Sequence, residues 1–484
     1  MQKLLARLAA RPAWAIALLG LALYLSGSWI LPLVDRDEPR FAEATREMRE
    51  RNDWVVPWFN GQHRFDKPPL IYWVQWLDYR LLGENAFAAR LPSALFATGA
   101  SLLVFFWARR LAKPQTALSA AVVFMTCLQM LVHARLAVAD MPMVFFVTAA
   151  VWSGWELSRP QAARAHVWWL VFHLSLAFGF LAKGPVAWLP IGGLLLGCWL
   201  RPQAFNLSWG RFAAGMLLTL SLVAAWGIPA ILRTNGEFMA VGIGQHVVYR
   251  SIGVMEGHGA GGWLGWVLTL PFYMLAFFFS FFPWAIRVPR ALRCWWPSRR
   301  RDAAGWYLLT QAGLVFLAFT LVRTKLPHYT LPAFPALAIW LAREVERGTI
   351  AGLKISRWAP VMAGVTLAIT IAGFLALRPL FVAHELFQKS KPYLKPEMRF
   401  ATVQYTEPSL VWEFRGMLTN HMQVLNPDQV ESFINRGGPV VLVVPTSFCK
   451  TNPGSLARKI IEVHARGINV VKGRKVELTA LIAL

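Results

Sequence analysis

The segment Val34–Trp73 reads VDRDEPRFAEATREMRERNDWVVPWFNGQHRFDKPPLIYW. It follows the first long apolar run of the chain and precedes many others, so it is a strongly charged segment beside a membrane. Asp37 and Glu38 stand near its start, and Asp66 and Lys67 stand near its end. Ionised side chains cost about 2.5–3.5 kcal/mol each at the centre of a membrane helix, so those kept beside the bilayer are usually functional. The segment therefore predicts one wall of a site at a membrane surface.

The composition is that of a membrane protein. Of the 484 residues, 56% are hydrophobic and 15% are charged, against about 25% charged residues in ordinary soluble domains. Apolar runs long enough to cross a bilayer recur along the chain. The sequence therefore predicts an all-α polytopic membrane bundle of about 11 transmembrane helices. We place them near residues 13–34, 88–108, 115–132, 138–156, 166–182, 184–200, 211–232, 265–286, 304–322, 329–345 and 357–377.

Two features of these runs carry further expectations. Basic residues precede the first run as in a signal peptide, but the run is too long for a signal peptide's apolar core, so we expect an uncleaved span. Only the segment Ala182–Pro185 separates the runs at 166–182 and 184–200. These two runs should therefore form a tight helical hairpin.

The net charge of +24 has its source in the loops. Basic residues gather in alternate short loops, such as the six arginines between Arg287 and Arg301. The positive-inside rule explains this pattern, so no nucleic-acid partner is expected. The same rule places the N-terminus on the inner side of the membrane, and an odd number of spans then places the C-terminus on the outer side. The four cysteines have no CxxC spacing, so neither a disulfide framework nor a cysteine zinc site is indicated.

The transmembrane domain, residues 1–377, should carry two periplasmic loops of note. The first loop, residues 34–87, predicts amphipathic helices at Glu38–Arg51 and Pro68–Leu82. The second, residues 233–264, is glycine-rich near its end and predicts a mobile loop.

The C-terminal segment 378–484 predicts a small periplasmic α/β domain. Its valine-rich stretch Pro439–Pro445 has the composition of a buried strand. We expect a helix at Ser455–Arg466, closed by Gly467, and further strands at Ile468–Val471 and Val476–Leu484.

Ionisable residues other than the inner-loop arginines gather at the predicted periplasmic ends of the spans. They are Asp35, Asp37, Glu38, Asp66, Lys67, Arg135, Asp140, Lys183, His246, Arg250, His258, Lys325 and His328, with Tyr249 and Tyr329 beside them. We interpret them as one site, although separate snorkelling charges would give the same pattern. His133 and His173 are expected to be satisfied residues of the bundle or its interface.

The mixture of charges suits one kind of ligand. Lys67, Lys183, Arg250 and Lys325 could neutralise a phosphate, because lysine supplies a point charge and arginine a bidentate fork. A carboxylate among them can accept a proton or stabilise positive charge on a sugar carbon. The combination fits transfer of a sugar from a lipid phosphate.

The motifs of the chain carry a resemblance to a known family. They are Asp37-Glu38-Pro39-Arg40-Phe41-Ala42-Glu43, Asn60-Gly61, Phe65-Asp66-Lys67-Pro68-Pro69-Leu70-Ile71-Tyr72-Trp73, Arg135…Asp140-Met141-Pro142, Ala182-Lys183-Gly184 and Lys325-Leu326-Pro327-His328-Tyr329-Thr330-Leu331-Pro332. In this order they resemble the aminoarabinose transferases that modify lipid A. Those enzymes belong to the wider GT-C family of polyprenyl-phosphate-sugar glycosyltransferases. The likeness covers residues 30–340.

The resemblance implies roles for individual residues. Asp37 matches the family's catalytic carboxylate, with Glu38 beside it, and Asp140 matches a second acid of the same cavity. The donor phosphate would be held by Lys67 and Arg250, with Lys183, Tyr329 and Lys325 nearby. No cofactor is required, but Asp66 and His246 match positions that can meet a divalent metal ion. The chain departs from the family where Phe41 replaces tyrosine, Asp66 replaces glutamate and Arg64 stands where tyrosine is common.

The resemblance implies an undecaprenyl-phosphate sugar as donor and lipid A as acceptor, with 4-amino-4-deoxy-L-arabinose as the sugar. One alternative is the same architecture acting with another sugar on a glycan or protein hydroxyl. A second is a transporter or lipid flippase, which predicts charges at mid-span and two related halves. Neither feature is visible in the sequence.

Overall fold

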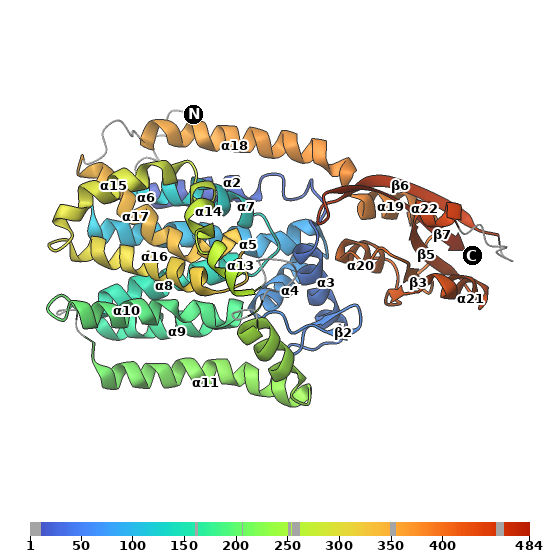
Figure 1. Ribbon diagram of the computed structural model, residues 1–484, viewed down its shortest axis with the longest axis horizontal. Coiled ribbons are helices and arrows are strands. Elements are labelled where there is room, and N and C mark those ends of the chain that lie inside the picture. The colour runs from blue at the N-terminus through green and yellow to red at the C-terminus, as the bar shows by residue number, and fades with distance from the viewer. Residues whose placement is uncertain are drawn as a thin grey trace. The chain divides into compact units, whose positions relative to one another are not determined.

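The computed structural model describes residues 11–159, 163–205, 207–249, 253, 262–348, 355–451 and 459–484. It divides into two compact units, each assembled from segments distant in the sequence (Figure 1). Unit 1 comprises Met1–Ser26, Phe65–Ile71 and Arg90–Leu367, and unit 2 comprises Gly27–Arg64, Tyr72–Ala89 and Ala368–Leu484. The charged segment that follows the first apolar run is therefore divided between the two units.

Unit 1 is a bundle of apolar helices that run side by side (Figure 1). Its α-helices are α2 (Pro12–Leu25), α5 (Ala86–Leu111), α6 (Pro114–Thr126), α7 (Leu128–His133), α8 (Asp140–Leu157), α9 (Ala165–Lys183), α10 (Leu189–Leu200), α11 (Trp209–Arg233), α13 (Gly262–Leu268), α14 (Phe272–Ser280), α15 (Val288–Trp295), α16 (Ala303–Leu321), α17 (Phe334–Glu346) and α18 (Ile355–Leu377). Shorter 3-10 segments include η1 (Gly184–Trp188) and η5 (Pro327–Ala333), and η2 (Met239–Tyr249) is a π-helix. Each apolar run named above is helical over most of its length, which confirms the predicted helical membrane bundle in its coarse form.

Several helices are long and apolar enough to cross a membrane. Within the described residues there are four such stretches, Ala86–Leu111, Ala165–Leu200, Trp209–Arg233 and Ala303–Leu321. The bent pair α13 and α14, with 41° between its helices, would make a fifth. The chain is thus a multi-pass membrane protein, and the expected number of about 11 spans stays a prediction.

The stretch 165–200 is folded back on itself, as the sequence predicts. Phe172 and Leu176 of α9 pack in one buried cluster with Leu194 of α10. A straight helix would separate Phe172 from Leu194 by roughly 33 Å, at 1.5 Å per residue. Such a contact requires a turn between them, and η1 supplies it at Gly184, whose φ of +76° lies in the left-handed region.

Two of the predicted spans show why the helices are shorter than the apolar runs. Helix α2 ends at Leu25 rather than continuing to residue 34, because Gly27 adopts a φ of +75°. Helix α6 ends at Thr126, because the backbone of the next residue, Cys127, is extended. The break before α7 lets the Leu128 amide donate to the carbonyl of Phe282 at 3.0 Å. Hydropathy reports the apolar run but not these local backbone changes.

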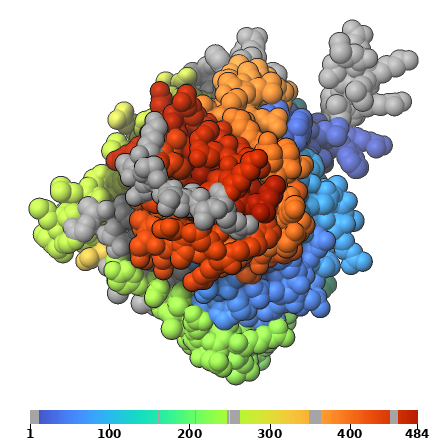
Figure 2. Space-filling view, turned by 90° about the vertical axis from the view of Figure 1, so that its right-hand side faces the viewer, coloured from blue at the N-terminus to red at the C-terminus, as the bar shows by residue number. Residues whose placement is uncertain are grey.

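Unit 2 contains the predicted α/β fold at its C-terminal end. A five-stranded sheet has the order β4-β3-β5-β7-β6, formed by β3 (Arg399–Thr402), β4 (Gln423–Val424), β5 (Val440–Pro445), β6 (Ile461–Asn469) and β7 (Arg474–Ala483). Strand β3 is parallel to β4 and β5, whereas β7 is antiparallel to β5 and β6. Its helices are α19 (Val382–Ser390), α20 (Pro408–Arg415), α21 (Val430–Asn435) and α22 (Thr446–Thr451). These segments form the orange-to-red surface in Figure 2.

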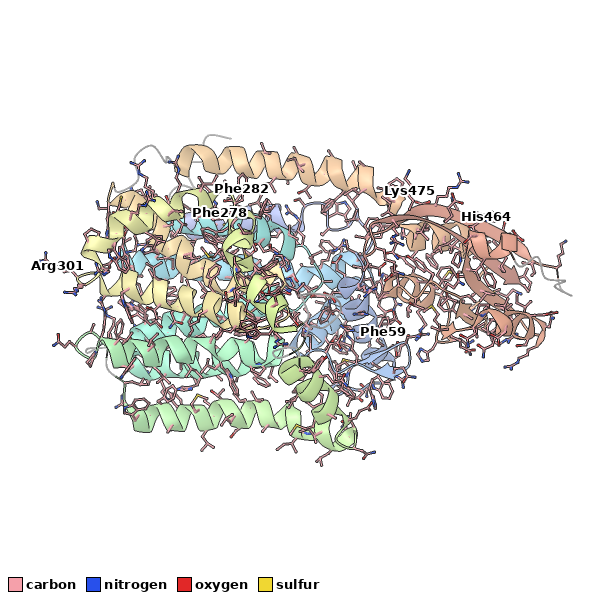
Figure 3. The ribbon with its side chains drawn as sticks, in the orientation of Figure 1. Phe59, Phe278, Phe282, Arg301, His464 and Lys475 are labelled. Carbon is pink, nitrogen blue, oxygen red and sulfur yellow. The ribbon has the colours of Figure 1, made fainter. Side chains whose placement is uncertain are left out.

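The β5 strand explains why both faces of this sheet are covered. Val441 and Val443 pack in one buried cluster, which also receives Phe59, labelled in Figure 3. Val440, Leu442 and Val444 pack in the other cluster. Successive side chains of a strand point to opposite faces, so a continuous apolar run fits a sheet that is buried on both sides.

The helix predicted at Ser455–Arg466 is wrong over its described part. Residues 461–469 form strand β6, which pairs with β7 along its whole length. Residues 452–458 lie outside the described residues. Apolar Ile461, Val463 and Ala465 alternate with polar side chains, and Val463 and Ala465 are buried. This period of two is the pattern of a strand and outweighs the helix propensity of the segment.

The first loop forms helices α3 (Asp37–Glu50) and α4 (Leu70–Leu82), close to the predicted ranges. Helix α3 is buried on its charged side as well as its apolar side, since Glu43 and Glu47 are fully covered. Glu43 pairs with Arg46 at 2.6 Å, and Arg415 of α20 pairs with Glu50 at 2.6 Å and lies 3.5 Å from Glu43. We refer to Glu43, Arg46, Glu47, Glu50 and Arg415 as the α3–α20 cluster. The helix is thus a structural element of unit 2 rather than an amphipathic helix with a solvated polar face.

Candidate active site

Two predicted site residues meet where α8 begins and α9 ends. Asp140 is the first residue of α8, and Lys183 is the last residue of α9. The Lys183 Nζ atom lies 2.5 Å from Asp140 Oδ1, and both side chains are largely buried. A carboxylate is favoured at a helix N-terminus and an ammonium at a helix C-terminus, so the two helix ends stabilise this pair. Their close approach confirms that these segments share one region of unit 1.

Two histidines extend this pair. His328 Nε2 lies 4.0 Å from Asp140 Oδ1, and the rings of His133 and His328 are 4.9 Å apart. Burial lowers the pKa of His328 well below its usual range, and Asp140 opposes that shift while Lys183, His133 and Lys67 add to it. Lys67 therefore lies within electrostatic reach of the same imidazole. We name Asp140, Lys183, His133, His328 and Lys67 the Asp140 cluster.

His133 is a satisfied residue of the bundle, as the sequence predicts, since it is buried and lies 3.0 Å from the Gln129 amide. Its ring also packs beside His328, a contact that the sequence does not predict. A signal is nevertheless present in the sequence, because His133 closely precedes the Arg135…Asp140 motif. A histidine at the end of an apolar run beside a charged motif is more informative than one inside a span.

Tyr329 completes one side of the cluster. Its ring lies 5.7 Å from Lys183 Nζ and packs against Phe319 with 4.8 Å between ring centroids. An ammonium over an aromatic face is held by a cation–π attraction of about 0.5–2 kcal/mol. The ring therefore adds to the hydrogen bond with Asp140 in limiting the positions that the Lys183 ammonium adopts.

Lys325 is held differently from the other predicted phosphate ligands. Its Nζ atom donates to the carbonyls of Phe319 and Thr320, at 3.1 and 2.5 Å, in the last turn of α16. Burial lowers the pKa of Lys325 to about 8. A lysine that satisfies the free carbonyls at a helix C-terminus is a capping residue. In this arrangement Lys325 stabilises the helix end, and its role toward a phosphate stays a prediction.

One group of described residues has the side chains of a metal site. The ligand atoms of His133, Asp140 and His328 lie within 4.8 Å of one another. The contacts of these residues do not favour a cation, because the Lys183 ammonium already occupies Asp140 Oδ1. The Gln129 amide, oriented by Ser280, lies 3.0 Å from His133 Nδ1, so Nδ1 accepts and Nε2 carries the proton. The group is better suited to an anion than to a divalent metal.

The residues predicted to meet a metal have only part of their surroundings described. The side chain of His246 and all of Arg250 and His258 lie outside the described residues, as does much of the loop predicted to be mobile. The backbone of η2, which carries position 246, passes close to the segment of Asp66, since a Cβ at Gly242 would lie 3.2 Å from the Phe65 carbonyl oxygen. The Phe65 ring also packs against the ring of Phe238, which directly precedes η2, with 5.8 Å between ring centroids. These contacts hold the Asp66–Lys67 segment in unit 1, where Lys67 Nζ donates to the Asp66 carbonyl at 2.9 Å.

Asp37 and Glu38 open helix α3 in unit 2. Asp37 is exposed, and within the described chain its carboxylate has no hydrogen-bond or ion-pair partner. Glu38 is buried and accepts a hydrogen bond from the Val34 amide at 2.8 Å. The two acids therefore differ in availability, because Glu38 is engaged in closing the helix start and Asp37 is free to meet a ligand.

The residues just before Asp37 are fastened to the C-terminal part of unit 2. Asp35 accepts hydrogen bonds from the Ser409 amide at 2.8 Å and from its hydroxyl at 2.5 Å. Arg36 pairs with Glu407 at 3.2 Å. Burial raises the pKa of Asp35 to about 6, against the lowering effect of the Ser409 hydrogen bonds. The start of α20 thus fixes the backbone that carries Asp37.

Comparison with known proteins supplies relatives. Residues 66–228 match the family model of the dolichyl-phosphate-mannose-protein mannosyltransferases. An undecaprenyl phosphate-alpha-4-amino-4-deoxy-L-arabinose arabinosyl transferase of Edwardsiella ictaluri is 30% identical over 376 residues, covering 74% of this chain and 66% of that protein. The protein of the same name from Erwinia tasmaniensis is 32% identical over 383 residues, covering 76% of this chain and 67% of the relative. The chain thus spans about two thirds of the length of these relatives.

A solved structure shares the fold over almost the whole chain. The crystal structure of ArnT from Cupriavidus metallidurans bound to undecaprenyl phosphate superposes with a TM-score of 0.78 and 20% identity. The match covers 96% of this chain and 97% of that protein. It identifies the architecture as that of a GT-C membrane protein, including the C-terminal α/β part.

Proposed function

The chain belongs to the family of undecaprenyl phosphate-alpha-4-amino-4-deoxy-L-arabinose arabinosyl transferases, and we propose that it transfers this aminosugar from an undecaprenyl-phosphate carrier to lipid A. The observation that carries the proposal is the Asp140 cluster, which joins two lysines, two histidines and one carboxylate at the ends of apolar helices. Its two ammonium groups suit a lipid phosphate. Membership of a glycosyltransferase family argues against the transporter or flippase alternative.

The donor phosphate would bind at the lysine side of the site. Lys183, in contact with Asp140, and Lys67, within electrostatic reach of His328, both bring an ammonium group to this side. The predicted Arg250 would add a bidentate fork. Tyr329 keeps the Lys183 ammonium in place. Charge fixed in advance in a water-poor site stabilises a leaving phosphate more strongly than the same charge in water.

The reaction we propose is a direct displacement at the anomeric carbon of the sugar. The acceptor oxygen forms a bond to that carbon while the bond to the carrier's phosphate oxygen breaks. Undecaprenyl phosphate leaves with the bonding electron pair, and the lysines neutralise its added charge. A phosphate acceptor on lipid A is already anionic and gives up no proton, so Asp37 would then stabilise positive charge on the sugar. With a hydroxyl acceptor, Asp37 would receive the proton.

The proposed location is the periplasmic face of the bacterial inner membrane. The arginine-rich loops, such as the one that contains Arg287 and Arg301, favour the cytoplasmic side. Asp140 and Lys183 stand at the opposite helix ends from Arg164, which precedes α9. The donor sugar would reach the site already activated on its lipid, so no nucleotide site is required. Binding of a divalent ion by Asp66 and His246 is a separate proposal, and the transfer described above does not depend on it.

A second acceptor class is supported by one observation. The matched family model, over residues 66–228, is that of protein mannosyltransferases, which the model's description pairs with a protein acceptor. The same displacement on a glycan or protein hydroxyl would then need Asp37 as the proton acceptor. The two acceptors therefore differ in how strongly the reaction depends on Asp37.

The test is a mass spectrum of lipid A from a bacterial strain that lacks its own aminoarabinose transferase. We expect wild-type protein to add a pentosamine, and Lys67→Ala and Asp37→Asn to reduce that addition. Lys475→Ala is the matched control, because Lys475 is exposed on β7 (Figure 3). Absence of pentosamine with the wild-type protein would contradict the lipid A assignment. Full addition by both variants would contradict the site assignment.

A further inference from the structure

A large cavity lies at the far end of α9 from the Asp140 cluster. Its volume is about 590 Å³, within the range of roughly 300–1,000 Å³ found for small-molecule sites. The walls are apolar and include Phe172, Leu194 and Phe212, and both Phe172 and Leu194 are fully buried. It is formed between α9, α10 and the start of α11, whose ribbons neighbour one another in Figure 1. This cavity has no part in the proposed transfer, because along α9 its nearest lining residue, His173, is about 15 Å from Lys183 and its rim at Ala165 is about 27 Å away.

The rim of the cavity is basic. Arg164 and Arg211 line it from exposed positions, together with the exposed His166. Neither guanidinium has a carboxylate partner in the part of the chain that the structure describes. Two neighbouring arginines on the same side behave differently, since Arg110 and Arg159 both pair with Glu156. The neighbouring arginines are therefore neutralised by an acid, whereas no carboxylate of the described residues neutralises the two on the rim.

Two tryptophans indicate how deep this rim lies in the membrane. Trp209 begins α11 and is 64% exposed, and Trp169 lines the cavity and donates to the Arg211 carbonyl at 2.7 Å. Exposed tryptophans of membrane proteins concentrate at the level of the lipid headgroups. The hydrogen bond from Trp169 also ties the start of α11 to α9 and so keeps the rim in place. The arginines therefore stand at headgroup level and the apolar walls lie deeper.

We propose that this cavity binds one anionic phospholipid of the cytoplasmic leaflet, with an acyl chain between α9 and α11 and its phosphate on Arg164 and Arg211. A guanidinium binds a phosphate by two parallel hydrogen bonds, which suits an anionic diester. Basic pockets between membrane helices on the cytoplasmic side recognise anionic headgroups for this reason. The apolar walls need a chain to fill them, so a soluble phosphate would satisfy only half of the site.

The experiment uses the full chain in nanodiscs of phosphatidylcholine with and without phosphatidylglycerol. Native mass spectrometry counts the phospholipids that remain bound after the disc is removed. We expect retained phosphatidylglycerol, and a loss of about tenfold or more in its affinity when Arg164→Ser and Arg211→Ser are combined. The control pair Arg290→Ser with Arg293→Ser removes the same charge from exposed positions of α15, away from the cavity.

A third variant tests the apolar half of the site. Ala214→Trp places a large side chain on a position that lines the cavity. We expect it to lower phosphatidylglycerol retention while both rim arginines remain. Equal retention in the rim and control pairs would overturn the proposal, as would equal retention of phosphatidylcholine by the wild-type protein. Aminosugar transfer is measured in a separate assay. If that assay shows no transfer, the retention of phosphatidylglycerol still decides whether the cavity binds a lipid.

Discussion

The Asp140 cluster in unit 1 and the α3–α20 cluster in unit 2 both bury charged side chains, but they differ in the kind of basic group. In the α3–α20 cluster, three glutamates meet two arginines, and Arg46 also pairs with Glu84 at 3.0 Å. In the Asp140 cluster, one aspartate pairs with Lys183, and Lys67 brings a second ammonium within electrostatic reach of His328. The arginine forks of the first cluster are matched to carboxylates, whereas the lysines of the second are flexible point charges that can turn toward a phosphate. The Asp140 cluster is therefore the one suited to an anionic ligand.

The comparison also separates two uses of the charged segment that follows the first apolar run. The α3 part, with Glu43 and Glu47, holds unit 2 together, and Glu47 accepts a hydrogen bond from the Gly61 amide at 3.0 Å. The Asp66–Lys67 part belongs to unit 1 and lies within electrostatic reach of the imidazole of His328. Charge density along a sequence therefore does not by itself mark a catalytic segment.

The largest effect is expected from breaking the α3–α20 cluster. Arg415→Met leaves Glu43 and Glu50 without this partner, and loss of one member of a buried ion pair costs about 3–5 kcal/mol of stability. Thermal unfolding in detergent measures the change. Arg466→Met is the control, since Arg466 pairs with Glu477 at 2.9 Å on the surface, where such pairs contribute about 0–1 kcal/mol. Equal destabilisation by both variants would contradict a structural role for the α3–α20 cluster.

A change in the Asp140 cluster should act on transfer. Asp140→Asn frees Lys183 from its 2.5 Å contact, and misplacing a positioned group typically lowers a rate by about 100-fold. The initial rate of sugar transfer by purified protein is the measurement. Combining Asp140→Asn with Lys183→Met removes both charges and should recover thermal stability without recovering the rate. Recovery of the rate would show that the pair is structural.

The contact between Asp35 and Ser409 predicts a pH dependence of unit 2. Burial raises the pKa of Asp35 to about 6, above its ordinary value of about 3.9, so the folded state binds the proton more tightly than the unfolded state. The associated stability is present below pH ~4 and is lost as pH rises through about 6. We expect a component of about 3 kcal/mol, because the pKa is raised by about two units and each unit corresponds to about 1.4 kcal/mol.

This component is measured by comparing the unfolding temperatures of the wild type and of Asp35→Asn, each at pH 4.5 and at pH 7. The substitution removes the titrating group, so the difference between the two pH values should shrink. An unchanged difference would assign the pH dependence to other groups of the chain.

The smallest effect is expected at Lys325. Because its ammonium caps the last turn of α16, Lys325→Met should lower stability by about 0.3–1 kcal/mol. The transfer rate per folded molecule should change much less than in Asp140→Asn. A loss of rate as large as that of Asp140→Asn would place Lys325 with the phosphate ligands, as the sequence suggests. Rates and unfolding temperatures of the same preparations decide between the two roles.

Much of the site can be predicted from residues and their order. Asp140 and Lys183 are recognisable because each stands at the end of an apolar run, and the structure brings their side chains together. His133 is not, because a histidine at a helix end looks the same in sequence whether it is satisfied within the bundle or packed against another imidazole. The capping role of Lys325 depends on where α16 ends, and that boundary is set by backbone geometry rather than hydropathy.

The fold is predictable where periodicity is unambiguous. The apolar runs predict the helices, and the valine run of β5 predicts a central strand. The segment of β6 resembles a helix in sequence because its alternation of buried and exposed residues is short and is flanked by good helix formers. The covered polar side of α3 cannot be anticipated, because its partner Arg415 lies more than 350 residues further along the chain. Contacts of such separation follow from the tertiary fold alone.

The most direct test of the central claim is the affinity of the purified protein for undecaprenyl phosphate. It should be measured in detergent for the wild type, Lys183→Met and Arg415→Met, below the unfolding temperature of each. We predict that Lys183→Met weakens binding by about tenfold or more, the effect of losing roughly 1.4 kcal/mol, while Arg415→Met leaves it within about twofold. Equal weakening by the two variants, or no weakening by Lys183→Met, would contradict the proposal that the Asp140 cluster binds the donor phosphate.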